Sequence, residues 1–218
     1  MDRRGKEIFQ GKAWWILLLL LIMSNSSAAP VLDSAEIEAG YYKSYNYEKS
    51  SNYPDAIKSL QLIYQTYPKA YGINNRLGYL YRLNRQFKNS EYHYKQAIQA
   101  QPDALSPRLG LMLTYLQMEA FDEANRLGFQ ILNIDFYNYY GNLRLAYGLR
   151  LIGNNEMAEK ILLKMLARYP SDVLYLTELG LLTLSNGEVE RTYAIMKDVQ
   201  ILDPENVTAK SVLLSLSQ

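Results

Sequence analysis

The chain has 218 residues, of which 49% are hydrophobic and 21% charged, and it contains no cysteine and a single histidine, His93. The apolar fraction is sufficient for a folded core, whereas the missing cysteines exclude disulfides, thiolate metal sites and a cysteine nucleophile. One histidine also excludes a multi-histidine metal site. Lysine and arginine total 23 against 22 acidic residues, so the net charge of +1 predicts no nucleic-acid partner.

Residues 1–28 have the layout of a secretory signal peptide. Basic residues precede an unbroken apolar run over 13–23, and small polar residues follow it, with Ser26 and Ala28 suited to the positions before the cut. The apolar run reaches about 16 Å as a helix, roughly half of a ~30 Å hydrocarbon core. This length favours cleavage after Ala28 over an uncleaved anchor, and it predicts an exported protein, periplasmic or secreted. Residues 29–36 are then a short linker, and peripheral membrane association stays open.

An internal repeat of 34 residues follows. Small residues, leucines and prolines each keep this step: Ala56, Ser90, Ala124, Ala158 and Thr192; Leu77, Leu111, Leu145 and Leu179; Pro68, Pro102, Pro170 and Pro204. Large residues recur at Leu60, Tyr94, Leu162 and Met196, although the third unit has Gly128 at this place. Each unit predicts two amphipathic helices of about fourteen residues that cross at the small residue, and a proline that ends the second helix. The units are 37–70, 71–104, 105–138, 139–172 and 173–206.

The second unit carries the pattern most fully, with Leu77-Gly78, Tyr81, Phe87, Ser90, Tyr94, Ala97 and Pro102. This pattern resembles the tetratricopeptide repeat (TPR) family, and the leading segment is similar to that of its exported bacterial members. The resemblance departs from the family where an aromatic residue is usual near the start of a unit, because Gly40, Asn74, Arg108, Asn142 and Leu176 stand there. It implies an all-α, right-handed superhelical solenoid of five helical hairpins. Asp33 and Glu36 predict a capping box before the first helix, and residues 207–218 predict a helix that caps the last hairpin.

The resemblance further implies that the first helix of each hairpin lines a concave groove. Carried over by position, the groove residues are Tyr45, Asn75, Tyr79, Arg82, Leu109, Leu113, Tyr140, Tyr147, Arg150, Leu181 and Leu184. Two units repeat a tyrosine followed three residues later by an arginine, which places a flat ring and a forked cation on one helix face. Such a groove favours a peptide or a helix of a partner protein. For any single tyrosine, the alternative is packing between hairpins.

The predicted function is therefore that of a non-catalytic adaptor with no cofactor and no metal. The sequence contains no glycine-rich phosphate loop, zinc pair or nucleophile elbow, and a lone histidine between tyrosines indicates packing rather than catalysis. The resemblance implies assembly work in the cell envelope, such as pilus, secretion or polysaccharide-export assembly. A glycan-binding module that stacks sugars on tyrosines is the alternative, and homo-oligomer formation stays open. The aromatic run over 136–140 either plugs the gap left by an absent proline or forms a second contact surface or a shelf for sugars.

Overall fold

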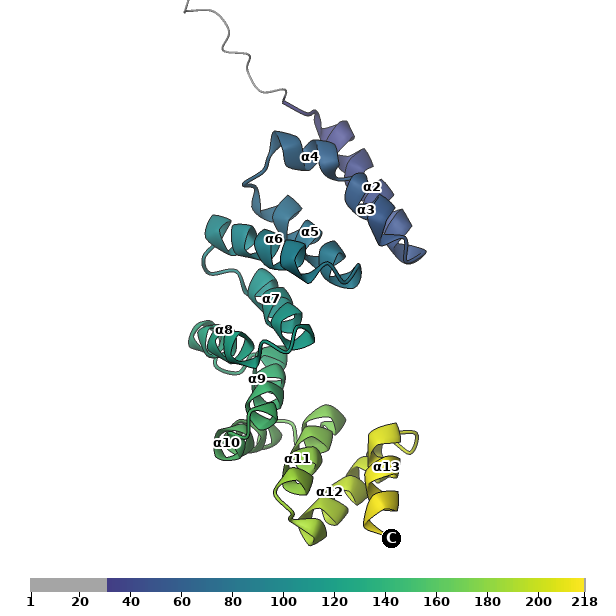
Figure 1. Ribbon diagram of the computed structural model, residues 1–218, viewed down its shortest axis with the longest axis vertical. Helices are drawn as coiled ribbons and strands as arrows, with labels where there is room; N and C mark the ends of the chain where they lie inside the picture. The colour runs from purple at the N-terminus through teal and green to yellow at the C-terminus, as the bar shows by residue number, and fades with distance from the viewer. Residues whose placement is uncertain (1–30, 218) are drawn as a thin grey trace, which may run out of the picture.

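The computed structural model describes residues 31–217, and Figure 1 shows them as a chain of helices. The predicted signal peptide, residues 1–28, lies outside these residues. Every regular element within 31–217 is a helix. In this part of the chain, no helix is long and apolar enough to cross a membrane.

The helices follow one another as antiparallel pairs, with a single helix at the end. The pairs are α2 (Ser34–Lys49) with α3 (Tyr53–Lys58) and α4 (Gln61–Thr66), α5 (Tyr71–Leu83) with α6 (Phe87–Ala100), α7 (Leu105–Gln117) with α8 (Phe121–Ile134), α9 (Tyr139–Leu151) with α10 (Asn155–Leu166), and α11 (Val173–Ser185) with α12 (Val189–Leu202). The last helix, α13 (Val207–Leu216), packs on α12. The predicted all-α solenoid of five hairpins and a capping helix is therefore confirmed. Figure 1 shows the array bending, with α8 and α10 on the outer side and α7 and α9 toward the inner side.

The first helix begins inside the segment expected to be a linker. The Asp33 carboxylate accepts from the Glu36 N–H at 2.7 Å, and the Glu36 carboxylate accepts from the Asp33 N–H at 3.0 Å, which confirms the capping box. Residues 34–36 therefore belong to α2. Leu32 is buried as well, and its N–H donates to the Tyr67 hydroxyl at 3.2 Å. The chain is thus fixed to the first hairpin from Leu32 onward.

The second helix of the first hairpin is interrupted, whereas the repeat predicts one continuous helix. The break between α3 and α4 falls at Ser59 and Leu60. The Ser59 hydroxyl donates to the Asp55 carbonyl at 2.7 Å, and the Leu60 N–H donates to the Ile57 carbonyl at 3.0 Å. A serine that bonds back four residues bends a helix, and the bond to Ile57 tightens the turn to three residues.

Buried core residues recur at the 34-residue step of the repeat. The small residues Ala56, Ser90, Ala124, Ala158 and Thr192 are all 0% exposed. In the second unit the Tyr94 ring occupies the space left by Gly78, because a Cβ there would lie 2.7 Å from the ring. In the third unit the sizes are reversed: Met112 fills the space left by Gly128, with its methyl carbon 2.9 Å from where a Cβ would stand. The exception at Gly128 therefore preserves the helix contact with the large side chain on the other helix.

The turn inside each hairpin also recurs at the same step. Ser51, Arg85, Glu119, Gly153 and Gly187 have φ of 58°, 57°, 58°, 76° and 76°. In each turn the following N–H donates to the carbonyl five residues earlier, as from Gln86 to Tyr81 at 2.9 Å. The left-handed conformation is cheap for glycine and costs other residues about 1–2 kcal/mol, so the first three turns hold it through their surroundings.

Candidate functional site

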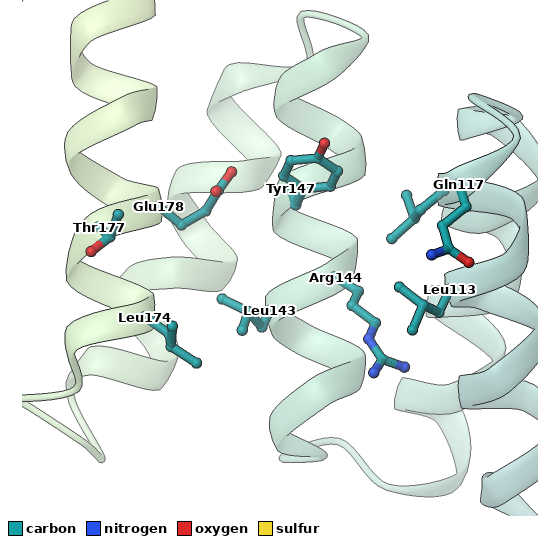
Figure 2. A pocket seen from close by; sticks show the side chains of 9 residues that line it. Leu113, Gln117, Leu143, Arg144, Tyr147, Leu174, Thr177 and Glu178 are labelled. Atoms are coloured by element: carbon teal, nitrogen blue, oxygen red, sulfur yellow. The ribbon is translucent and has the colours of Figure 1, made fainter. Parts of the chain in front are cut away.

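A pocket of about 520 Å³ opens across α7, α9 and α11. Apolar side chains supply most of its wall, with four polar side chains among them: Leu113, Leu116, Leu143, Tyr147 and Leu174, then Gln117, Arg144, Thr177 and Glu178. Figure 2 shows these side chains reaching into one space from three neighbouring first helices. Leu174 is 52% exposed and Tyr147 is 38% exposed. An apolar hollow with a few polar groups is typical of a binding site.

Two of the residues expected to line the groove, Leu113 and Tyr147, lie in this pocket. Leu109 is adjacent to it: its side chain packs against the central core, and its carbonyl accepts from the Arg144 guanidinium at 2.8 Å. Tyr140 is 53% exposed and lies under the same guanidinium, 5.3 Å from it. Four of the predicted groove residues therefore lie close to one another, on α9 and on the facing side of α7.

Arg150 is held by the protein itself. Its Nε donates to the Glu178 carboxylate at 2.6 Å, with the two side chains only 14% and 10% exposed. Burial raises the pKa of Glu178, and the positive charge of Arg150 acts against that rise. The guanidinium also lies 5.5 Å from the Tyr147 ring. Arg150 therefore holds Glu178, a residue of the pocket wall, while the Tyr147 ring stays accessible.

The other tyrosine–arginine pair is arranged differently. The Tyr79 hydroxyl donates to the Glu48 carboxylate at 2.8 Å, and Glu48 also forms an ion pair with Arg76 at 2.5 Å. Arg82 lies 5.4 Å from the Tyr79 ring. Within residues 31–217, Arg82 forms no ion pair, and its Nε is buried without a hydrogen-bond partner. Within the described residues, the Tyr79 hydroxyl thus has a carboxylate partner, whereas the Arg82 guanidinium has none and interacts with Tyr94 instead.

The remaining predicted groove residues lie away from the pocket. Tyr45 is 51% exposed and lies beneath Arg76, 3.9 Å from the guanidinium. The Asn75 amide donates to the Ser106 hydroxyl at 3.2 Å. Leu181 and Leu184 pack against the apolar cluster of α12 and α13. The capping helix thus covers the apolar strip that these two leucines were expected to offer to a partner.

His93 is a packed residue, as expected. It is 6% exposed, its Nδ1 lies 2.9 Å from the Asn74 amide oxygen, and its ring stacks on Tyr81 at 5.2 Å. Burial lowers its pKa to about 4, so the ring is neutral at pH 7. Within the described part of the chain, no cluster of histidine and acidic side chains is suited to a metal ion.

The aromatic run over 136–140 divides into packed and exposed rings. The Tyr139 hydroxyl donates to Asp172 at 2.9 Å, and its carbonyl accepts from the Tyr175 hydroxyl at 2.6 Å, which ties α9 to α11. Phe136 and Tyr137 are 56% and 45% exposed. Two cations lie over these exposed rings. Lys164, on α10, is 3.9 Å from the Phe136 ring, and Arg168, just after α10, is 5.0 Å from the Tyr137 ring.

The sequence analysis missed Gln117, Arg144, Leu174, Thr177 and Glu178 as pocket residues. Positions carried over from the family did not include the sixth place of a unit, where Arg144 and Glu178 both stand. A signal for this place does exist: Arg76, Arg144 and Glu178 are charged residues at the same register, each facing the preceding first helix.

Paired helices, a repeated left-handed turn and an inner pocket define a helical-repeat protein. Its fold is the TPR fold, as predicted. No family model matches the sequence, and no curated protein matches it. Solved structures do match. A TPR protein from Parabacteroides merdae superposes with a TM-score of 0.76 at 15% identity, covering 84% of this chain and 73% of that one.

A thermophilic TPR protein from Thermus thermophilus gives a TM-score of 0.64 at 14% identity, over 83% of this chain and 98% of that one. YrrB, described as a TPR protein with an unusual peptide-binding site, gives 0.67 at 11% identity, over 82% and 92%. These superpositions show a shared fold.

Proposed function

We propose that this protein is a non-catalytic scaffold that binds a segment of a partner protein in the inner pocket. The observation that carries the proposal is the open apolar pocket across α7, α9 and α11, with Leu174 and Tyr147 accessible at its wall. Apolar side chains of a partner would remove this surface from water, which is favourable by about 25 cal/mol per Å². The peptide-binding site in the description of YrrB, a protein of the same fold, supports this function.

The test compares two leucines of similar exposure. Leu174 lines the pocket and is 52% exposed, whereas Leu163 on α10 is 45% exposed and lies outside the pocket. We expect Leu174→Asp to abolish capture of a specific partner by crosslinking, because a carboxylate in the pocket opposes apolar contact. Leu163→Asp should retain the partner, and circular dichroism should show equal helicity. Equal capture by both variants would remove the pocket from the function.

The proposed place of action is the cell envelope, with the protein exported as a periplasmic or secreted chain. The support is the residue pattern of 1–28, and the resemblance adds pilus, secretion or polysaccharide-export assembly as the setting. An intact mass beginning at Ala29 in the exported fraction is the expected result. A full-length mass retained in membranes would instead indicate an uncleaved anchor.

A glycan-binding module is the second candidate. The observation that favours it is the exposure of the Phe136 and Tyr137 rings. It ranks second because Lys164 and Arg168 already lie over these rings. Titration with envelope polysaccharide should leave the tyrosine signals of the protein unchanged under the scaffold function, and broaden them under this one.

A further inference from the structure

Charged residues link neighbouring first helices at a fixed register. The ion pair between Glu48 and Arg76 joins α2 to α5, and the one between Arg150 and Glu178 joins α9 to α11. In both pairs the second residue follows the first by 28 positions. The twelfth residue of one unit therefore faces the sixth residue of the next.

The two central junctions follow this register without a pair. Between α5 and α7, the register places Arg82 opposite Gly110, which has the position of the glutamate in the α9–α11 junction. Between α7 and α9, Leu116 faces Arg144. Each junction thus has an arginine and lacks its carboxylate. Within residues 31–217, neither arginine forms an ion pair, and the one hydrogen bond of the Arg144 guanidinium goes to the Leu109 carbonyl.

The two guanidinium groups both lie near one tyrosine, Tyr94. Tyr94 extends from α6 between Gly78 and Gly110, and a Cβ at Gly110 would lie 2.5 Å from its hydroxyl oxygen. Burial raises the pKa of Tyr94, and the charge of Arg82, its hydrogen bond to the tyrosine and the charge of Arg144 act against that rise. Burial lowers the pKa of Arg144, and the charge of Arg82 lowers it further. Two like charges are therefore held together, partly buried, next to a hydroxyl group.

We propose that Arg82 and Arg144 bind a carboxylate from an aspartate or glutamate side chain of the partner segment that occupies the pocket. This proposal rests on the proposed function and names the chemistry of its ligand. Arginine presents a planar fork that matches a carboxylate, and a half-buried guanidinium is stabilised strongly by one. The partner's carboxylate would form, at the centre of the array, the kind of ion pair that Glu48 and Glu178 form at the two flanking junctions.

The position of the two arginines favours a side chain over a chain terminus. Arg144 belongs both to the pocket wall and to the arginine pair, and Figure 2 shows it extending from α9 toward α7 while Leu174 and Thr177 lie on the α11 side. A segment seated in the pocket therefore passes the arginines along its length. The expected ligand is an acidic residue next to apolar residues that enter among Leu113, Leu143 and Leu174.

The experiment screens the full chain against a library of peptides of about a dozen residues. Their C-termini are linked to the support as amides, so every carboxylate comes from a side chain. Wild type should select peptides with an aspartate or glutamate beside apolar residues. The variant Arg82→Gln/Arg144→Gln should still select peptides with apolar residues but should no longer prefer those with an aspartate or glutamate. The affinity for a selected acidic peptide should fall by about tenfold to a hundredfold, and replacing the peptide glutamate with glutamine should have no further effect in this variant.

Arg126→Gln is the matched control, because Arg126 lies on α8 with its side chain 72% exposed and its removal should leave selection unchanged. Acidic residues that are absent from the wild-type peptides, or equally selected by Arg82→Gln/Arg144→Gln, would overturn the carboxylate site and leave the scaffold function standing. Binding only to peptides with a free C-terminal acid would overturn the side-chain source. If wild type selects no peptide, the proposed function and the carboxylate site both fail.

Discussion

Gly110 offers a quantitative test of the packing that holds the arginine pair. A Cβ at this position would lie 2.3 Å from the Tyr94 Cζ. The ring is 3% exposed and is also pinned by Gly78, which lies against its other end with a Cβ position 2.7 Å from Cδ1. Over-packing of this kind costs about 1–3 kcal/mol, whereas alanine in place of a helical glycine contributes about 0.5–1 kcal/mol. Gly110→Ala should therefore lower the free energy of unfolding by about 1–2 kcal/mol.

The assay is urea unfolding of wild type, Gly110→Ala, Tyr94→Leu and the double variant, followed by circular dichroism. Leucine removes the end of the ring, so Gly110→Ala should become neutral or stabilising in that background. The coupling free energy should then be about 1–3 kcal/mol. Gly72→Ala is the control, because its nearest neighbour, the Tyr41 hydroxyl, is at an ordinary 3.5 Å. Additive effects, or a Gly110→Ala variant as stable as Gly72→Ala, would refute the close approach of Tyr94.

Three further predictions concern pH, the turns and the buried ion pair. The folded-state pKa of His93 is about 4, below the unfolded value of 6.5, so unfolded chains bind the proton first and stability should fall as pH drops from 6.5 toward 4. His93→Gln should remove up to about 3 kcal/mol of this pH dependence in unfolding curves at pH 7 and pH 4. Gly153→Ala should cost about 1–2 kcal/mol by thermal or urea unfolding, because its φ is +76° and no side chain lies nearby to relieve the strain; a smaller cost for Ala than for Asn would contradict this. Glu178→Gln should lower stability by about 1–3 kcal/mol by leaving the Arg150 charge unpaired, whereas Arg150→Met/Glu178→Leu should stay within about 1 kcal/mol of wild type.

The repeat predicted the core because helix crossing imposes its own spacing. A small residue is required wherever two backbones approach, so Ala56, Ser90 and Thr192 mark the crossings before any coordinates are known. Gly128 interrupts the track of large residues in the sequence, although the helix contact is preserved because Met112 fills the space. The size requirement applies to the sum of two facing side chains, and a single track of the repeat shows only one of them.

The sequence marks only some of the left-handed turns, for a similar reason. Gly153 and Gly187 mark a left-handed turn, whereas Arg85 and Glu119 adopt the same conformation without any compositional sign. The neighbouring helices impose the conformation there, and that constraint belongs to the folded array. The interruption at Ser59 is equally local, because serine also occurs within continuous helices.

The site was predicted through Leu113 and Tyr147, but its charged residues depend on a different spacing. Repeats are compared at 34 residues, whereas side chains on neighbouring first helices meet at 28. At the 28-residue spacing, the α2–α5 and α9–α11 junctions each have an ion pair. At the two junctions between them, an arginine stands opposite a glycine or a leucine. An unpaired, half-buried guanidinium is a local cost that leucine or a paired carboxylate would avoid. Departures from local consistency of this kind are expected where a chain holds a group ready for a ligand, and here Arg144 lies in the wall of the open pocket.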